Sequence, residues 1–309
     1  MKIVRFSQNG HSARLGCFMG QDRVVDLEAS CAAWLSAKGV VRSAPIAAAL
    51  FPQSTRGFLE GGSATQDMLA TMVEATKAGK WEPVSHPANS VRLHAPINDP
   101  GKFICIGLNY RDHAAETGAA VPKEPPVFPK WNNSILDPGE PILRPRGEKT
   151  LDWEVELGLV IGKTARFVPK DKALDYVYGY TIINDVSARD FQFHTSQWGP
   201  GKMGDTLAPV GPYIADRAEI PDPHALSLKA WVNGTLMQDG NTKNFIFDIG
   251  YIIQYLSNIM TLSPGDLIST GTPAGVGFSR KPQITLQPGD VCKLEITGLG
   301  TIENPVKDA

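Results

Sequence analysis

The stretch that decides the fold reads Asp152-Trp153-Glu154-Val155-Glu156-Leu157-Gly158-Leu159-Val160-Ile161. Asp152, Glu154 and Glu156 alternate with apolar residues, and on a β-strand a period of two places all three carboxylates on one face. The residues that follow are too apolar for an edge that water covers freely. We therefore expect a largely buried strand with one acidic face.

Three like charges on one strand face repel one another, and two arrangements relieve the repulsion. A bound divalent cation would neutralise them, and ligands that are all oxygen favour Mg²⁺ or Mn²⁺, with Ca²⁺ as a further candidate, over zinc. Alternatively, the acids lie on the wet side of an exposed strand. The spacing by itself leaves both interpretations open.

Further strand signals surround this stretch, whereas helical signals are few. Short apolar runs at 103–106 and 180–184 predict buried strands, and two Pro-Gly-Asp turns near the C-terminus each precede another strand. The clearest helix spans about 248–260, where apolar residues recur on one side. Because the strands do not alternate with helices as βαβ units would, we predict an α+β, mostly β domain of mixed strands over residues 102–309.

Residues 1–85 predict a small α+β domain of their own. An Asn9-Gly10 turn and strand-like runs up to Leu27 indicate a hairpin and a small sheet, and an Ala-rich stretch over about 29–80 has helical spacing. Prolines then accumulate, and proline denies the backbone its donors. We place a linker at residues 86–101, between the two predicted domains.

Composition narrows the class of protein. The chain has 309 residues, is 42% hydrophobic, and carries 30 basic against 32 acidic residues. That is enough apolar material for a packed core, and without a basic run there is no electrostatic footprint for nucleic acid. No apolar stretch is long enough for a membrane span, and the start lacks the pattern of a signal peptide. The four cysteines form no Cys-x-x-Cys pair, which favours a reduced, cytoplasmic protein without a zinc site.

Several polar residues outside the acidic stretch are candidates for the same site. Asp185 ends the apolar run at 180–184, and a short helix after it would present Arg189 and Gln192. An acid in this place is either functional or a helix N-cap. Lys202 lies on a glycine-containing loop, where it is either a cation of the site or a solvated side chain.

His113 and Glu116 follow the strand predicted at 103–106. They are three residues apart, so they would be neighbours on a short helix. A carboxylate beside an imidazole fixes its tautomer and raises its basicity, which suits a general base that activates water. Gly118 and a proline-rich run come next, as expected of a loop that orders over a site. A solvated helix with an incidental ion pair is the alternative.

A glycine-rich turn leaves the strand predicted at 267–270 and reads Gly271-Thr272-Pro273-Ala274-Gly275-Val276-Gly277. Exposed backbone amides and the Thr272 hydroxyl can hold a carboxylate or a phosphate, although a plain turn is equally consistent. It is not a P-loop, because no Gly-Lys-Ser/Thr follows.

In their order along the chain, these blocks resemble the fumarylacetoacetate hydrolase family over residues 100–306. The matching blocks are Ile106-Gly107-Leu108-Asn109-Tyr110 with His113 and Glu116, Glu154-Val155-Glu156-Leu157, Asn184-Asp185-Val186-Ser187-Ala188-Arg189-Asp190, Lys202 with Pro209-Val210-Gly211-Pro212, and Thr270 to Gly277. The resemblance implies a mixed β-roll catalytic domain behind a small, variable N-terminal domain, and a homodimer.

The resemblance also implies a metal site and a catalytic base. Glu154, Glu156 and Asp185 would coordinate one Mg²⁺ or Mn²⁺, with Asp152 beside them on the acidic face. His113 with Glu116 would activate water on a lid that closes over the substrate.

The substrate contacts implied by the resemblance come from several loops. Arg189, Gln192 and Lys202 would contact the carboxylate and oxo groups, Lys202 would also take part in catalysis, and Thr272 would anchor a carboxylate. Lys130 belongs to the family's lid-proximal region and would bind substrate. Trp131 follows it where smaller residues are common, and we expect this side chain to reshape the mouth of the pocket.

The activity expected from the resemblance is metal-dependent hydrolysis of a carbon–carbon bond in a β-diketo acid of the acylpyruvate type. Water activated by His113 would attack the distal carbonyl, and a pyruvate enolate stabilised by the metal would leave. An isomerase, decarboxylase or hydratase that acts on a 2-oxo acid through the same enolate is the nearest alternative. A non-catalytic oxo-acid binding protein fits less well, because it has no use for a water-activating pair. The expected partner is a small oxo acid, and neither nucleic acid nor a membrane.

Overall fold

A computed structural model describes residues 1–8 and 10–309. Asn9 of the predicted Asn9-Gly10 turn lies outside the described residues. The strands on either side, β1 (Lys2–Ser7) and β2 (Arg14–Met19), pair antiparallel. None of the helices in the described part of the chain has the length and hydropathy that a membrane crossing requires.

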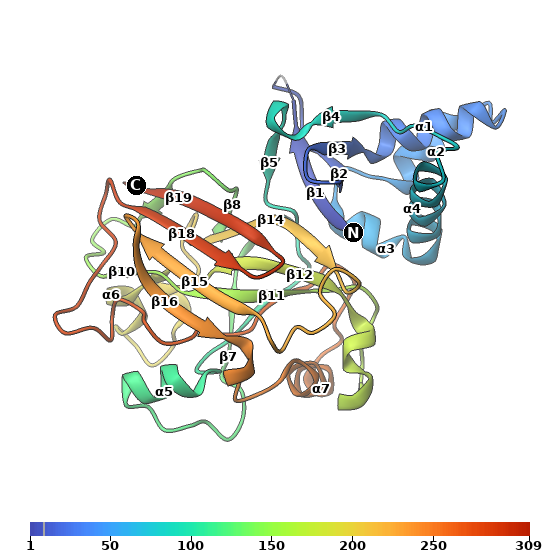
Figure 1. Cartoon of the computed structure of the whole chain (residues 1–309). Helices are drawn as coiled ribbons and strands as arrows, with labels where there is room; N and C mark the ends of the chain where they lie inside the picture. Colours follow the sequence, from blue (N-terminus) through green and yellow to red (C-terminus); the bar gives the residue numbers. More distant parts are fainter. Residues whose placement is uncertain (9) are drawn as a thin grey trace.

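The N-terminal part forms strands and then helices, as the sequence predicts. Its remaining elements are β3 (Arg23–Asp26), α1 (Leu27–Ala37), α2 (Ser43–Leu50), α3 (Thr55–Glu60) and α4 (Gly62–Lys77). Helix α1 begins where β3 ends because the Asp26 side chain accepts a hydrogen bond from the Ala29 backbone N–H (3.0 Å). In Figure 1 these helices lie together at the outer end of the molecule, away from the C-terminus.

Two short strands occur inside the segment predicted as a linker. β4 (Ser85–Pro87) pairs with β3, β5 (Arg92–His94) pairs with β1, and a 3₁₀ turn lies between them. Strands of three residues need few backbone donors, so the prolines nearby do not prevent them. The segment is therefore bound to the N-terminal sheet along part of its length.

The catalytic region, residues 102–309, is named after the role predicted for it and contributes most of the β-structure. Its strands in the large sheet are β6 (Phe103–Ile106), β7 (Val127–Lys130), β8 (Ile135–Leu136), β11 (Val155–Ile161), β12 (Val177–Asn184), β14 (Ala208–Asp216) and β17 (Leu267–Ser269). The described residues form one 12-stranded sheet in the order β4-β3-β2-β1-β14-β12-β11-β17-β6-β7, with β5 beside β1 and β8 beside β14. Antiparallel pairing of β1 with β14 makes the N-terminal strands a continuation of the catalytic sheet.

Two smaller sheets complete the region. One has the order β16-β15-β18-β19-β9, and a two-stranded sheet pairs β10 with β13. Their bounds are β9 (Ile142–Arg144), β10 (Leu151–Asp152), β13 (Ser187–Ala188), β15 (Ser227–Val232), β16 (Thr235–Asn241), β18 (Val291–Ile296) and β19 (Gly300–Asp308). Strands β15 and β18 of the larger of these sheets contact β11, and β18 also contacts β12, so β11 is covered and every one of its residues is buried.

The helices of the catalytic region are α5 (Arg111–Thr117), α6 (Arg189–Gln192) and α7 (Ile249–Ile259). α7 matches the helix predicted at 248–260. Its N-cap Asp248 accepts a hydrogen bond from the Tyr251 N–H (2.8 Å), and its apolar side, which includes Ile252 and Leu256, is buried. The 3₁₀ turns of this region are Asn132–Ser134, Lys170–Tyr176, Gly199–Gly201 and Thr242–Asn244.

A chain of hydrogen bonds joins the N-terminal strands to the catalytic region. Ser7 Oγ lies 2.8 Å from His94 Nε2, and His94 Nδ1 lies 2.6 Å from Asp137 Oδ2. The Ala95 N–H donates to Asp137 Oδ1 (2.7 Å). Serine hydrolases use the same order of residues as a nucleophile relay, but Ser7 is only 9% exposed and does not line the adjoining cavity. We interpret the chain as a structural link.

Asp137→Asn should destabilise the protein at neutral pH and lose that effect in acid. Burial by itself raises the pKa of Asp137, but hydrogen bonds from His94 and the Ala95 N–H outweigh it and lower the pKa. A carboxyl with a lowered pKa contributes stability above its unfolded value of about 3.9, and the contribution is lost as pH falls through the folded value. We expect urea unfolding to show a loss of about 1–2 kcal/mol at pH 7, and a smaller difference from wild type at about pH 3, below the unfolded value. An unchanged difference at the two pH values would contradict this.

Candidate metal centre and active site

Three carboxylates come together at one end of the central strand pair. Glu154 precedes β11, Glu156 lies on it, and Asp185 follows the neighbouring β12. The antiparallel register pairs Val155 with Asn184, and the Asp185 N–H donates to the Glu154 carbonyl (2.9 Å). All three side chains are buried, and one oxygen of each lies within 4.8 Å of the others. The acids therefore face a common centre, and the interpretation of a wet, exposed strand is wrong.

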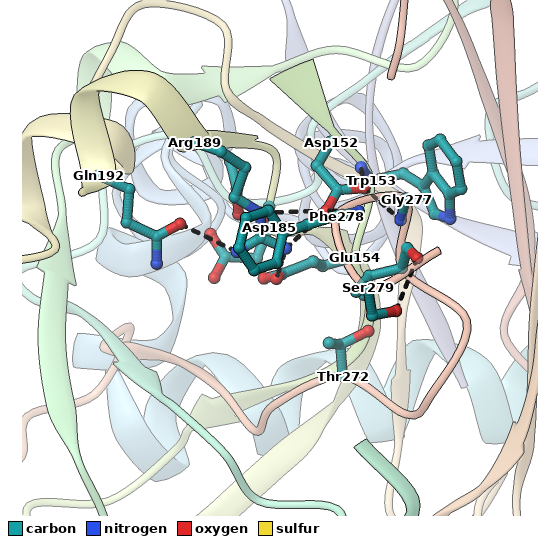
Figure 2. A network of polar contacts seen from close by, with 12 residues as sticks. Asp152, Trp153, Glu154, Asp185, Arg189, Gln192, Thr272, Gly277, Phe278 and Ser279 are labelled. Atoms are coloured by element: carbon teal, nitrogen blue, oxygen red, sulfur yellow. Dashed lines mark hydrogen bonds and ion pairs between the residues drawn. The ribbon is translucent and has the colours of Figure 1, made fainter. Parts of the chain in front are cut away.

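Asp152 does not join this cluster, because the chain is not one continuous strand here. β10 ends at Asp152, and β11 begins only at Val155. The Asp152 carboxylate instead accepts hydrogen bonds from the backbone N–H groups of Gly277 (2.7 Å) and Phe278 (3.1 Å). Figure 2 shows Asp152 on the far side of Arg189 from Gln192.

Two predicted cations lie directly on the acidic cluster. Arg189, at the start of α6, donates through Nη2 to Asp152 Oδ2 (2.7 Å) and Glu154 Oε1 (2.6 Å). Lys202 Nζ lies 2.7 Å from both Glu154 Oε2 and Asp185 Oδ2. Both cations are buried, so each is held by the carboxylates rather than by water.

Lys130 also reaches the cluster, but from behind. Its Nζ donates to the carbonyls of Val186 (3.1 Å), Lys202 (2.7 Å) and Leu207 (2.7 Å), and it lies 2.9 Å from Asp185 Oδ1. Its ammonium group therefore has partners for all its protons within the protein. Lys130 does not line the cavity in front of the acids, so the structure places it under Asp185 and not on the side open to a substrate.

The electrostatics of the cluster leave one charge to be neutralised. Burial, then the nearby charges of Asp185 and Glu154, raise the pKa of Glu156 well above its usual range. For Glu154, burial acts in the same direction, but Lys202 and Arg189 outweigh it and lower the pKa. Four buried carboxylates, counting Asp152, face the three cations Lys130, Arg189 and Lys202, so either a proton on Glu156 or a bound cation takes up the remaining negative charge.

The donor set fits a divalent cation. Asp185 Oδ1 is buried and accepts no hydrogen bond among the described residues, because Lys130 gives its protons to carbonyls, although Lys130 Nζ forms an ion pair with it at 2.9 Å. Among the same residues, Glu156 accepts hydrogen bonds only at Oε2, from Ser269 Oγ (2.5 Å) and the Gly271 N–H (2.8 Å). Glu156 Oε1 is thus free and Asp185 Oδ1 has only an ion pair, and carboxylate oxygens such as these are the ligands that Mg²⁺, Mn²⁺ or Ca²⁺ prefer.

His113 and Glu116 form the predicted pair on α5. His113 Nδ1 lies 2.7 Å from Glu116 Oε1, and the Gly275 N–H donates to Glu116 Oε2 (2.9 Å). Burial by itself raises the pKa of Glu116, but the hydrogen bonds from His113 and Gly275 outweigh it and lower the pKa. Glu116 is thus an ionised acceptor that holds the His113 ring, and His113 lines the same cavity as the three acids.

The glycine-rich turn binds the protein's own carboxylates. Its N–H groups at Gly271, Gly275 and Gly277 donate to Glu156, Glu116 and Asp152. The sequence suggested that these amides hold the carboxylate or phosphate of a ligand, but in the structure these three amides are already occupied by carboxylates of the protein. Gly271 and Gly275 have φ values of +94° and +105°, and a Cβ at Gly275 would meet the Met237 carbonyl oxygen at 2.3 Å. Glycine is therefore required at this turn.

Thr272 and Gln192 line the cavity, each with one polar atom engaged. Thr272 Oγ1 donates to the Val155 carbonyl (3.0 Å) and accepts from Gln238 Nε2 (2.8 Å). Gln192 Oε1 accepts from Arg189 Nη1 (2.9 Å), which leaves the Gln192 amide group facing the cavity as a donor. In Figure 2 Gln192 and Thr272 lie on opposite sides of Glu154.

The cavity in front of the acids has a volume of about 230 Å³. That is below the range of about 300–1,000 Å³ typical of ligand pockets, so it suits a small substrate. Trp131 does not line it: this side chain is 53% exposed and borders a different cavity beside β7. The expectation that Trp131 shapes the mouth of the site is therefore wrong, because β7 turns it away from the acids.

Aromatic side chains that sequence reasoning missed form much of the remaining wall. They are Phe128, Phe193, Trp198 and Phe278. Two lie against the cations: the Phe128 ring is 5.1 Å from Lys202 Nζ, and the Phe278 ring is 5.5 Å from the Arg189 guanidinium carbon. No periodicity connects these residues, so only the folded chain brings them together.

Comparison with known proteins places this arrangement in a family of enzymes. The family model for the fumarylacetoacetate hydrolase C-terminal domain matches residues 102–307. The chain is 50% identical over 232 residues to a fumarylacetoacetate hydrolase domain-containing protein 2 homolog of Dictyostelium discoideum, a match that covers 72% of this chain and 76% of that protein. The chain belongs to the fumarylacetoacetate hydrolase family, as its motifs predict.

Solved structures confirm the predicted α+β, mostly β fold. A fumarylacetoacetate hydrolase from Exiguobacterium antarcticum matches with a TM-score of 0.80 at 34% identity, over 100% of both chains. A 5-carboxymethyl-2-hydroxymuconate delta-isomerase from Mycobacterium smegmatis gives 0.74 at 30%, over 100% of this chain and 99% of that one. A maleylpyruvate hydrolase from Sphingobium sp. SYK-6, solved with manganese(II) and pyruvate, gives 0.75 at 27%, over 100% of both. These neighbours include hydrolases and an isomerase, and one of them binds a divalent metal.

Proposed function

We propose that this protein is a metal-dependent hydrolase that cleaves a carbon–carbon bond in a β-diketo acid of the acylpyruvate type. The observation that carries the proposal is that the His113–Glu116 pair and the Glu154, Glu156 and Asp185 carboxylates open into one cavity of about 230 Å³. A base that can activate water thus faces a site suited to binding the oxo acid. The manganese and pyruvate in the maleylpyruvate hydrolase structure support the same chemical class.

The residues of the chain supply proton transfer and orientation. With Nδ1 held by Glu116, His113 uses Nε2 to take a proton from water, whose oxygen forms a bond to the distal carbonyl carbon. The carbon–carbon bond then breaks, and its electron pair remains on the pyruvate half, which is protonated to give pyruvate beside a carboxylic acid. A divalent cation held by the three carboxylates, as Mg²⁺ or Mn²⁺, would supply Lewis-acid polarisation of the oxo groups.

The substrate contacts follow from the groups that face the cavity. The Gln192 amide faces the cavity as a donor, so it can bind a substrate carboxylate or oxo group. Thr272 lines the same cavity, but its hydroxyl proton is donated to the Val155 carbonyl, so it contributes shape and not a hydrogen bond to that group. Arg189 and Lys202 place positive charge beside the acids, where negative charge develops as the bond breaks. Lys130 acts indirectly in this proposal, by holding Asp185 and the loop at Lys202.

The test uses metal-stripped protein and a panel of acylpyruvates, with and without Mg²⁺ or Mn²⁺. We expect the enol absorbance to fall and pyruvate to appear only when metal is added. Metal-dependent loss of the enol without pyruvate would favour the second candidate instead. Lack of any reaction with every member of the panel would overturn the proposed activity.

The second candidate is an isomerase or decarboxylase that acts on a 2-oxo acid through an enolate. It is favoured by the likeness to the delta-isomerase, which at 30% identity is as similar in sequence as the hydrolase neighbours. These reactions need a group that transfers a proton, but they do not need water to attack a carbon atom. His113 could therefore serve a hydrolase or an isomerase. Incorporation of ¹⁸O from labelled water into the carboxylic acid product separates them, because only hydrolysis introduces it.

We also propose that the protein is a homodimer that buries the edge strand β7. β7 ends the large sheet, and an open edge with apolar side chains invites pairing. Val127 and Trp131 are 42% and 53% exposed there, and Ile259 of α7 is exposed next to Met260, which borders the same cavity as Trp131. Light scattering should give a dimer mass for wild type and a larger monomer fraction for Trp131→Glu. An equal dimer fraction in the variant would exclude this face.

A further inference from the structure

The charged groups of the catalytic cavity are already matched with one another. Its lining includes the cations Arg189 and Lys202, and each lies within 2.7 Å of buried carboxylates of the protein. The carboxylate of the 2-oxo acid can bind beside a divalent cation and the Gln192 amide. Among the described lining residues, no further cation is left for a second carboxylate at the other end of a substrate.

The rest of the lining is apolar and mainly aromatic. Phe193 and Phe278 form one wall, with ring centroids 5.0 Å apart, and Phe128 and Trp198 form another, with centroids 5.7 Å apart. Trp198 packs so closely over the chain that a Cβ at Gly107 would meet its ring at 2.4 Å. A substrate anchored at the acids would therefore place its far end between aromatic faces.

We propose that this cavity selects 2-oxo acids whose far end is uncharged, as in an alkanoyl- or aroylpyruvate, and that Phe193 and Phe278 set this selectivity. The proposal rests on the proposed function and narrows its substrate class. A buried carboxylate without a partner loses its hydration and gains nothing in return, whereas an alkyl or aryl group gains by leaving water. The named substrate of the maleylpyruvate hydrolase neighbour ends in a carboxylate, so the proposal sets this chain apart from it.

A second groove next to the cavity explains why Phe193 and Phe278 would set the substrate selectivity. Phe193 and Phe278 also line this adjoining groove, in which the cations Arg146, Lys149 and Arg189 outnumber the one carboxylate, Asp190. Within the described chain, no carboxylate lies within ion-pair distance of the side chains of Arg146 or Lys149. The aromatic pair is thus the common wall between an apolar cavity and a basic groove. Shortening either ring would open a route from the acids to positive charge.

The first experiment measures binding, which does not depend on turnover. Calorimetry with Mn²⁺-loaded wild type compares 2-oxopentanoate with 2-oxoglutarate, which have equal chain lengths and differ in a terminal methyl or carboxylate group. We expect the uncharged ligand to bind at least 10-fold more tightly. Equal affinities, or tighter binding of 2-oxoglutarate, would overturn the proposal.

The second experiment uses variants of the common wall. Phe278→Ala and Phe193→Ala should weaken 2-oxopentanoate binding and strengthen 2-oxoglutarate binding, so that the ratio falls at least 10-fold. Phe167→Ala is the control, because Phe167 is 66% exposed and lies outside both hollows. A ratio that stays at its wild-type value in both wall variants would show that the aromatic pair does not set the selectivity.

Turnover separates this proposal from the one it rests on. If wild type releases pyruvate from acylpyruvates but prefers those that end in a carboxylate, the selectivity fails and the hydrolase stands. If no acylpyruvate releases pyruvate while the binding ratio is as expected, the hydrolase fails and the selectivity of the cavity stands.

Discussion

His113→Ala should lower kcat for pyruvate release by about 10²–10⁴-fold, the range that a positioned general base contributes. The reason is local: Glu116 holds Nδ1 at 2.7 Å, and the ring faces the cavity. The metal ligands lie on other elements, at the ends of β11 and β12. Mn²⁺ affinity should therefore change by less than a factor of a few. Stopped-flow assays and calorimetry on the same preparation measure the two quantities.

Two variants of the same helix make the result specific. Glu116→Gln keeps the size of the side chain but removes the charge that fixes the imidazole, so its loss of kcat should be smaller than that of His113→Ala. Arg111→Ala, at the exposed start of α5, should leave kcat unchanged. If the His113→Ala variant kept the wild-type kcat, His113 would not be the general base, and the reaction would have to proceed without it.

The sequence indicated the three carboxylates of the cluster because their signal is local. Glu154 and Glu156 alternate with apolar residues, and Asp185 ends a buried strand, so each is visible within ten residues of chain. What the sequence could not show is that β11 and β12 are neighbours in antiparallel register. The family resemblance implied only that the three acids belong together, and the register explains why Asp185 lies beside Glu154.

The partners of the glycine-rich turn could not be predicted in the same way. Its amides bind Glu156, Glu116 and Asp152, which lie 115, 159 and 125 residues away along the chain. A pattern of glycines indicates that backbone amides can bind a carboxylate, but it does not indicate which carboxylate they bind. Lys130 illustrates the same limit, because its motif indicates the site but not the side of Asp185 on which its ammonium group lies.

Glu156→Gln should separate metal binding from stability, and the two effects should have opposite signs. Without metal, the raised pKa of Glu156 favours its neutral form, which the amide imitates, and Ser269 and Gly271 can still donate to the amide oxygen that replaces Glu156 Oε2. The free energy of unfolding of the metal-free protein should therefore be unchanged or higher by about 1 kcal/mol. With metal, one of three anionic ligands is lost. Mutating a residue that only hydrogen-bonds a metal ligand typically lowers metal affinity by about 10–100-fold. Because Glu156→Gln removes a ligand itself, we expect Mn²⁺ affinity to fall by more than about 100-fold.

Thermal unfolding with and without Mn²⁺ measures both effects at once. At a concentration 100 times the dissociation constant, the metal should stabilise wild type by about 2.7 kcal/mol, and the variant should show almost none of this. Glu148→Gln is the control variant. Glu148 is a buried carboxylate outside the cluster, and it accepts a hydrogen bond from the Thr150 N–H (2.7 Å). This variant should therefore be less stable than wild type but should be stabilised by Mn²⁺ to the same extent. A Glu156→Gln protein that unfolds more easily than wild type without metal would show that the charges of Lys130, Arg189 and Lys202 already balance the acids, and that no cation is needed to hold them together.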